Sequence, residues 1–325
     1  MVHKTNFNHF SGEVAKPFEG APLDTEIHIG QCVFVPNDPI GVYHVEDMSH
    51  YRGTLLSVHF ATSTWSSVEG SAVMVAPGIA LTAFHVIDNL ISHITASELE
   101  IFCTGLTPNG LRLWRVRQMT RCDGTDLMIL SLAYASPIPQ DGQFDQTTMT
   151  TRLPPIGETI MIAGFRASGE YVPWENETFA VKNGHLSYCA GIRTGVGVVT
   201  QHLLGGGRMV GGPVIEVACS TVGGMSGGPA FDKDGNVIGI LSTGIDAPEG
   251  RGPSQVSLLW PALTATIIPA FLIHLFPDPA RLLDVDLRFC GIEGRSAVRY
   301  DFERGCYCVD WDNVSAGPSG RHSNP

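Results

Sequence analysis

From about residue 54 onward the sequence consists of short apolar runs that end at Gly, Pro, Asn or Asp. Runs of this length, separated by turn residues, are typical of the strands of a β-barrel or sandwich. The 37 glycines and 21 prolines favour the same fold class, because both residue types interrupt long helices. The pattern therefore predicts an all-β protein. The expected strands fall into two groups, 55–60, 71–75, 79–82, 99–103, 111–116, 127–132 and 159–164, then 186–191, 195–202, 213–218, 237–242 and 254–259.

The segments around these runs differ from them in composition. Residues 1–50 begin with a loose, polar lead and are expected to form an N-terminal extension. Within a main domain at 51–279, the stretch 133–155 is rich in Pro, Gln, Thr and Asp, and we expect it to cross between two halves. Residues 280–315 are predicted to form a C-terminal appendage of short strands, and 316–325 a disordered tail.

The composition argues against one class of partner and allows a large core. Acidic residues outnumber basic ones 32 to 20, which gives a formal net charge of −12. Binding to nucleic acid needs a basic surface that neutralises phosphates, so we expect no nucleic-acid partner. Hydrophobic residues make up 43% of the chain and charged residues only 16%, which is enough for a sizeable core.

The cysteines and the amino-terminal segment bear on the cellular compartment. Met1–Ala21 contains no apolar core after a basic stretch, so we expect no secretory signal. The eight cysteines are scattered along the chain, which favours reduced thiols in a cytoplasmic protein. Cys306 and Cys308 could supply half of a zinc site, but no matching Cys or His pair lies nearby. We therefore expect neither a metal nor a cofactor.

One segment, 256–276, is free of acidic and basic residues and is about as long as a membrane span. Pro261, Pro269 and His274 interrupt it, together with several hydroxyl residues. We interpret it as a buried strand at 255–259 that leads into a core-packed helix with Pro261 near its start. A membrane anchor is the alternative.

The strongest local motif is Gly223-Gly224-Met225-Ser226-Gly227-Gly228-Pro229, in which glycines surround one serine. A glycine-rich bend lets the backbone N–H groups of Gly224 and Ser226 point to one spot beside the hydroxyl. Such a pair of donors would hold the oxyanion of a tetrahedral intermediate. The simpler alternative is a glycine loop that only turns the chain.

Two further residues lie where a serine nucleophile would need them in sequence. His85 directly follows the expected strand at 79–82, and Asp126 directly precedes the one at 127–132. A serine hydroxyl needs a base to take its proton, and a neutral histidine needs a carboxylate to fix its tautomer. Taken singly, His85 would be a structural residue and Asp126 a strand cap. The order His, Asp, Ser makes a catalytic set the better hypothesis.

These three blocks resemble the signature blocks of the trypsin-like (chymotrypsin-fold) serine peptidases. Ala80-Leu81-Thr82-Ala83-Phe84-His85-Val86 is similar to the family's histidine block, and Gly224-Met225-Ser226-Gly227-Gly228-Pro229 to its serine block. The resemblance covers about 50–265. It implies two six-stranded antiparallel β-barrels, to which the sequence adds a C-terminal helix and a small terminal extension.

The resemblance also implies a role for each matching residue in a serine endopeptidase. His85 would be the general base and acid, Asp126 its orienting partner and Ser226 the nucleophile, with the amides of Gly224 and Ser226 as the oxyanion hole. Ser242 would lie on the strand that pairs with an extended polypeptide substrate, and its hydroxyl would support Asp126. The substrate-binding residues implied in this way are Ser220, Thr221, Leu241, Ser242, Thr243 and Gly244.

Departures from the family pattern narrow the prediction. Secreted members carry Asp before the nucleophile, where it pairs with a newly cut amino terminus, but this chain has Met225. Val86 and Val222 stand where secreted relatives often carry disulfide cysteines. Both differences are typical of the intracellular or bacterial branch of the family. The expected pocket contains no acidic residue, so the resemblance implies an apolar or small residue before the scissile bond (P1).

Three alternatives stay open at the level of sequence. Gly224-Met225-Ser226-Gly227-Gly228 also satisfies the G-x-S-x-G elbow of an α/β-hydrolase esterase, although Pro229 and an expected strand follow it rather than a helix. A second alternative is a non-catalytic binding module that keeps the barrels without the activity. The third concerns regulation, because the two terminal extensions would either dock a regulatory protein partner or simply cover barrel edges.

Overall fold

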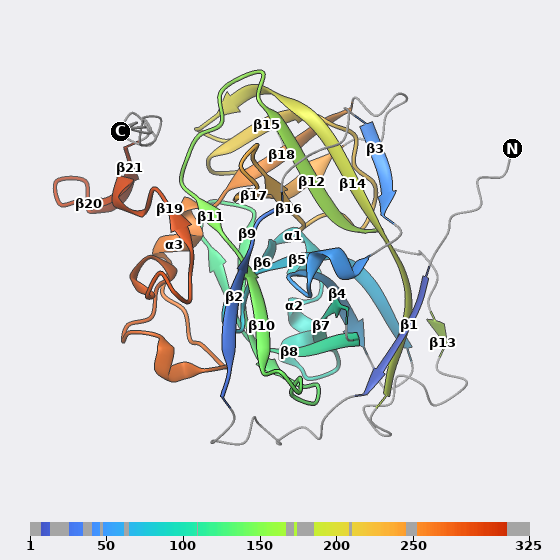
Figure 1. Cartoon of the computed structure of the whole chain (residues 1–325). Coiled ribbons are helices and arrows are strands. Elements are labelled where there is room, and N and C mark those ends of the chain that lie inside the picture. The colour runs from blue at the N-terminus through green and yellow to red at the C-terminus, as the bar shows by residue number, and fades with distance from the viewer. Residues whose placement is uncertain are drawn as a thin grey trace, which may run out of the picture.

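The structure is a computed structural model that describes residues 8–13, 26–34, 41–45, 48–61, 65–108, 110–166, 172–173, 185–207, 210–244 and 252–310. Within these ranges almost all regular structure is β-strand, and two closed barrels form the body of the molecule (Figure 1). The tail expected to be disordered, 316–325, lies outside the described residues.

The first barrel is a closed sheet of six antiparallel strands in the order β5–β4–β7–β8–β9–β6, with β6 pairing back to β5. Alternate side chains of each strand face inward, as Leu56, Val58 and Phe60 do, so the barrel is filled by its own apolar residues. Each run predicted between 55 and 132 forms one of these strands. They are β4 (Leu55–Ala61), β5 (Trp65–Ala76), β6 (Ile79–Ala83), β7 (Glu100–Thr107), β8 (Gly110–Cys122) and β9 (Leu127–Tyr134).

The second barrel has the order β16–β12–β14–β15–β18–β17 and closes through β16 and β17. The predicted architecture of two six-stranded antiparallel barrels is therefore confirmed, and Figure 1 shows the second barrel above the first. The strands are β12 (Thr159–Arg166), β14 (His185–Leu203), β15 (Val214–Ala218), β16 (Pro229–Phe231), β17 (Val237–Gly244) and β18 (Pro253–Leu258).

Two details of the second barrel differ from the prediction. The runs 186–191 and 195–202 form one strand, β14, rather than two. A side chain at Gly195 would overlap Cys219, and one at Gly197 would overlap Ala218. These glycines therefore allow the segment at Ala218 and Cys219 to pack closely against β14, and the strand continues through them. The short strand β16 begins at Pro229 and was not predicted, because it offers only three residues of pattern.

The N-terminal segment is more ordered than its composition indicated. β1 (Asn8–Glu13) and β3 (Gly41–Val45) both pair antiparallel with β14, and β2 (His28–Cys32) pairs parallel with β10 (Gln143–Thr147). The prediction of a loose lead is therefore wrong for 8–13, where backbone pairing with a long strand compensates for the lack of an apolar pattern. A further two-residue strand, β13 (Val172–Pro173), pairs with β5.

The C-terminal part contains no long helix among the described residues, so the helix expected after β18 is wrong in length. α3 (Trp260–Thr264) is five residues long, and the chain is extended at Ala265. Ile267 then bridges Ala280, and Pro269 is incompatible with a continuing helical hydrogen-bond ladder. No described helix has the length and apolar character needed to cross a membrane. The other helical turns are η1 (Met48–Tyr51), α1 (His85–Asp88), α2 (Ile91–Thr95), η3 (Ile273–Leu275), η4 (Leu282–Asp284) and η5 (Arg295–Ala297).

The residues after 280 lie along one side of the barrels and end in a hairpin (Figure 1). β11 (Met149–Thr150), in the crossing segment, pairs with β17 on one side and with β19 (Ile292–Glu293) on the other. β20 (Val298–Asp301) and β21 (Cys306–Val309) form the hairpin. The C-terminal segment is therefore linked to the second barrel through β11.

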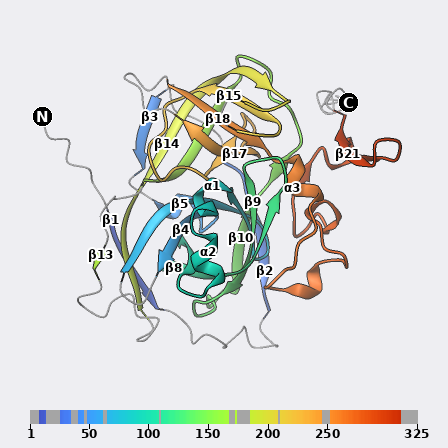
Figure 2. The same ribbon diagram turned by 180° about the vertical axis from the view of Figure 1, so that it is seen from behind.

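The two barrels pack against each other through a shared apolar cluster. It contains Val73 and Leu81 of the first barrel with Phe165, Phe231 and Ile240 of the second, all at most 1% exposed. Figure 2 shows α1 at the boundary between the barrels. This boundary brings together the segments that carry the predicted site.

Candidate active site

His85 and Asp126 form a hydrogen-bonded pair at one end of the first barrel. β6 pairs with β9 so that Ala83 lies opposite Leu127, which places the residues just beyond both strands side by side. The Nδ1 atom of His85 lies 2.8 Å from Oδ2 of Asp126, and the backbone N–H of His85 donates to Oδ1 at 2.9 Å. The carboxylate thus holds the proton on Nδ1 and leaves Nε2 as an acceptor. The Asp126 side chain is 13% exposed and that of His85 47%, so the ring is open to solvent.

Ser226 comes from the second barrel, in the turn between β15 and β16. Ser71 of the first barrel makes three hydrogen bonds to the second barrel, two of them to this turn. The Ser71 N–H donates to the Ser226 carbonyl at 2.8 Å, and the Ser71 hydroxyl donates to the Gly224 carbonyl at 2.8 Å. The same hydroxyl accepts the N–H of Phe165 at 2.8 Å. Sequence reasoning missed Ser71, because its partners are 94 to 155 positions away.

The turn also lies directly beside the histidine block. A Cβ atom built on Gly70 would be 2.6 Å from the Val86 side chain and 3.1 Å from the Ser226 carbonyl. One on Gly227, whose φ is +85°, would overlap the Ser71 carbonyl and the Thr82 hydroxyl. Only glycine fits this close approach of the two barrels. The structure thus brings Ser226 next to the segment that carries His85. Among the described residues, no hydrogen bond joins the Ser226 hydroxyl to His85.

The backbone around Ser226 leaves two donors unused. The N–H of Met225 bonds to the Val222 carbonyl at 3.2 Å, and the N–H of Gly227 bonds to Leu241 at 2.8 Å. The N–H groups of Gly224 and Ser226, by contrast, have no acceptor in the part of the chain that the structure describes. Gly224 has φ = +89°, a conformation that favours glycine. These two amides are therefore available to a ligand.

The predicted substrate-binding residues lie close to this turn, but the slot between them is narrow. Thr221 is 5% exposed, and its hydroxyl lies 3.2 Å from that of Ser254. A Cβ atom on Gly244 would overlap the Thr221 hydroxyl and lie 2.5 Å from that of Ser254. The Ser220 hydroxyl, fully buried, accepts the N–H of Gly252 at 2.9 Å. Two hydroxyl side chains therefore fill the space between the segments at 220–222 and 242–244.

Two of the other predicted residues have different surroundings from those expected. The Ser242 hydroxyl pairs with that of Ser257 at 2.7 Å and does not reach Asp126, so the expectation that it supports this carboxylate is wrong. Leu241 packs in the core of the second barrel. β16 pairs with β17 only as far as Ile240, which leaves the Ser242–Gly244 edge without a strand partner on that side among the described residues.

Comparison with known proteins agrees with this geometry. The profile of a family described as "Trypsin-like peptidase domain" matches residues 70–240, about half of the chain. The match contains His85, Asp126 and Ser226. The chain belongs to the trypsin-like peptidase domain family. A polypeptide substrate is the ligand that membership of this family implies.

Two solved structures with a similar fold are only distantly similar in sequence to this chain. The protease domain of MamO from Magnetospirillum magneticum, solved in its apo form, is 15% identical, with 63% of this chain and 92% of that chain covered and a TM-score of 0.38. Deg5 is also 15% identical, with 63% and 83% covered and a TM-score of 0.41. Neither likeness is close enough to transfer a function. No curated protein matches the sequence.

The residue before Ser226 has a structural role in this trypsin-like peptidase domain. Met225 is fully buried and packs in the core of the second barrel. The Met225 sulfur accepts the Val222 N–H at 3.5 Å. Gly164 lies so close that a Cβ atom added to Gly164 would be 2.7 Å from the Cα atom of Met225. An apolar side chain thus anchors the serine turn from beneath, at the place where secreted members use a charged Asp.

Proposed function

We propose that the chain is a serine endopeptidase in which Ser226 is the nucleophile, His85 the general base and acid, and Asp126 the residue that orients His85. The observation that carries the proposal is the 2.8 Å contact between His85 Nδ1 and Asp126 Oδ2 beside a serine turn fixed by Ser71. Apo sites commonly have long catalytic hydrogen bonds that tighten with substrate, so the open Ser226–His85 geometry is compatible with this role.

The proposed reaction has two halves. The Ser226 hydroxyl attacks the scissile carbonyl and gives its proton to His85 Nε2, while the amides of Gly224 and Ser226 bind the resulting oxyanion. The tetrahedral intermediate collapses, the amine leaves with the proton from His85, and an acyl ester on Ser226 remains. Water, deprotonated by His85, then hydrolyses this ester and releases the acid product. Asp126 stabilises the imidazolium in both halves.

Fluorophosphonate labelling tests this proposal directly. We expect the purified chain to form a covalent adduct, because this reagent detects a serine hydroxyl that a neighbouring base activates. Ser226→Ala removes the nucleophile and His85→Ala removes the base, so both variants are expected to lose the label. Intact-mass spectrometry measures the adduct, and circular dichroism checks folding. A folded wild-type chain that stays unlabelled would instead support a non-catalytic binding module.

The proposal includes a small P1 residue. In this family the P1 side chain would enter between Thr221 and Gly244, where the hydroxyls of Thr221 and Ser254 already lie. An acidic side chain that would attract Lys or Arg is absent from the described pocket residues, Ser220, Thr221, Ser254 and Gly244. This narrows the expected apolar or small preference to Gly, Ala and Ser.

A peptide-library digest measures that preference. Cleavage after Ala is expected to exceed cleavage after Phe by at least ~10-fold in kcat/KM, since a few carbon atoms of misfit in a pocket change rates by this order. A Ser254→Gly variant removes one hydroxyl from the slot and is expected to raise the relative rate after Val or Leu. Predominant cleavage after Arg, Glu or Phe by the wild type would contradict the assignment.

Two further parts of the proposal concern context. We place the protein in the cytoplasm, because the positions of the disulfide cysteines of secreted relatives hold Val86 and Val222. We assign the C-terminal segment a covering role rather than a regulatory one. Asn236, in the turn before β17, donates to Glu293 at 2.9 Å, and the Met149 N–H donates to Gly291 at 2.8 Å. These bonds tie the segment to the second barrel and need no protein partner.

A further inference from the structure

Strand β8 concentrates positive charge in an acidic protein. Four of the chain's 20 basic residues, Arg112, Arg115, Arg117 and Arg121, lie on this one strand. Three of them place the guanidinium over a phenylalanine ring: Arg112 over Phe144, Arg115 over Phe102 and Arg121 over Phe84, at 5.0, 5.4 and 3.9 Å from the ring centre. Such stacking recovers only part of the hydration free energy that a cation loses on burial.

Arg112 is the most deeply buried of the four arginines on β8. It is 9% exposed, yet it makes no hydrogen bond or ion pair with any of the described residues. None of its nitrogens is completely shut off from solvent, and Arg112 lines a hollow at the surface. A guanidinium with so little exposed surface has lost most of its hydration, and a bound acceptor would satisfy its N–H donors.

The hollow next to Arg112 has a volume of about 580 Å³. Leu111, Tyr134, Ile138 and Pro139 supply apolar walls, and Asp141 lies on its rim. Hydrogen bonds hold the wall in place: the Leu113 N–H donates to Ser136 at 2.5 Å, and the Tyr134 hydroxyl donates to the Pro137 carbonyl at 3.2 Å.

Arg112 has acidic neighbours, but none of the described ones forms an ion pair with it. Burial lowers the pKa of Arg112, while Tyr134, Asp145 and Asp141 act to raise it from beyond ion-pair distance. Asp145 also acts on Cys32 and Arg52, and Asp141 accepts the N–H of Gln143 at 3.1 Å. The guanidinium therefore stays charged, with its fork of donors unused. A planar carboxylate matches this fork through two parallel hydrogen bonds.

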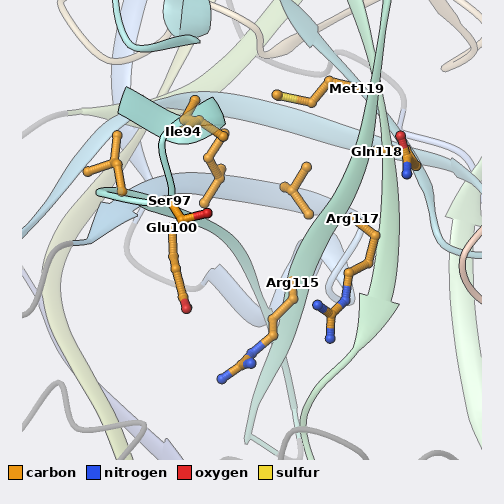
Figure 3. A pocket seen from close by; sticks show the side chains of 10 residues that line it. Ile94, Ser97, Glu100, Arg115, Arg117, Gln118 and Met119 are labelled. Carbon is orange, nitrogen blue, oxygen red and sulfur yellow. The ribbon is translucent and has the colours of Figure 1, made fainter. Parts of the chain in front are cut away.

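A second hollow on the same strand, shown in Figure 3, provides the contrast. There Arg115 and Arg117 extend from β8 on the same side, with Glu100 on the adjacent strand. Arg117 is exposed to water, and Arg115 is only half-buried, with the Glu100 carboxylate acting to raise the pKa that burial lowers. Arg117 is therefore a matched control for Arg112, because it is the same residue type on the same strand.

We propose that Arg112 and the hollow between Leu111, Tyr134, Ile138 and Pro139 form a binding site for a carboxylate next to an apolar side chain. The carboxylate would belong to a free amino acid or to a peptide C-terminus, and Asp141 would meet the ammonium group of the former. The site lies at the far end of β9 from Asp126, about 25 Å away along an eight-residue strand. It is therefore separate from the proposed catalytic centre.

Isothermal titration of the full chain with three leucine derivatives tests the site. N-acetyl-leucine is expected to bind with a dissociation constant below about 1 mM, and N-acetyl-leucinamide, which lacks the carboxylate, at least ~10-fold more weakly. Arg112→Gln should weaken N-acetyl-leucine by a similar factor, and Arg117→Gln should leave it unchanged. Thermal unfolding checks that both variants fold.

The outcomes separate the two sources of carboxylate and allow refutation. If free leucine binds more tightly than Ala-Ala-Leu, and Asp141→Asn weakens only the binding of free leucine, the site binds amino acids. If Ala-Ala-Leu binds more tightly than free leucine, the site binds a peptide C-terminus. Equal binding of acid and amide, or no saturable heat from any leucine probe at about 10 mM, would overturn the proposal. The acid–amide comparison uses the wild-type chain, so it stands even where an Arg112 variant fails to fold.

Discussion

An Asp126→Asn variant is expected to keep its fold and to lose about 10⁴-fold in kcat. Asparagine can still accept the His85 backbone N–H through Oδ1, which here is a 2.9 Å hydrogen bond. Its amide, however, presents N–H groups to His85 Nδ1, so the ring must place its proton on Nε2. The tautomer is then wrong for accepting the Ser226 proton, and no carboxylate stabilises the imidazolium. Hydrolysis of a peptide with Ala at P1, together with the fluorophosphonate labelling rate, measures the loss.

The chain contains a matched control for this experiment. His93 Nδ1 and Glu98 Oε2 are also 2.8 Å apart, but both side chains are more than half exposed and lie on α2 and just after it. Glu98→Gln breaks an equivalent contact away from Ser226 and should leave kcat unchanged. An Asp126→Asn variant within about tenfold of the wild type would mean that His85 does not depend on Asp126 for its orientation.

The largest expected effect on stability comes from Arg152→Met. Arg152 donates to both oxygens of Glu158 and, at 2.9 and 3.3 Å, to Oδ2 of Asp232. The Asp232 side chain is fully buried, and that of Glu158 is 6% exposed. Hydrogen bonding to Glu158 is the largest of the causes that raise the pKa of Arg152. Removing the cation leaves two buried carboxylates unpaired, which costs about 3–5 kcal/mol in the free energy of unfolding.

Urea unfolding followed by circular dichroism measures this loss as a lower midpoint with an unchanged slope. Arg288→Met is the control, because the Arg288–Asp286 ion pair is 2.7 Å long but 77% and 44% exposed. An exposed pair of this kind contributes little to stability, because water and salt screen its charges. Equal effects of the two substitutions would show that the buried cluster is not a major source of stability.

Much of the first barrel follows from the local pattern of the sequence. Each of its strands is long enough to show an apolar run. The local pattern did not correctly predict the structure of residues 8–13 in the N-terminal extension or of the 256–276 segment. β1 is a strand because β14 offers it a backbone partner, and 256–276 leaves the helical conformation after α3 because Pro269 and tertiary packing prevent its continuation. Neither the pairing of β1 with β14 nor the packing after α3 could be predicted from the residues of these segments alone.

The specificity pocket shows a similar limit. Ser220, Thr221 and Gly244 were identified from the family pattern, but Ser254 was not, although its hydroxyl lies between Thr221 and Gly244. It sits on β18, and only the pairing of β17 with β18 brings it opposite Gly244. The assignment of Ser242 to Asp126 failed for a related reason, because a hydroxyl takes the nearest partner in space, here Ser257.

The sequence by itself determined the candidate catalytic residues, the fold class and the position of the serine turn. Each of these depends on a short segment whose residue types have a direct chemical or conformational meaning. Only the tertiary structure decided the hydrogen bonds of Ser71 between the barrels and the ion pairs of Arg152 with Glu158 and Asp232. It also decided the burial of Arg112. These features join residues that are far apart in the chain. Hydrogen bonding and burial depend on distance in space, which a pattern of neighbouring residues does not specify.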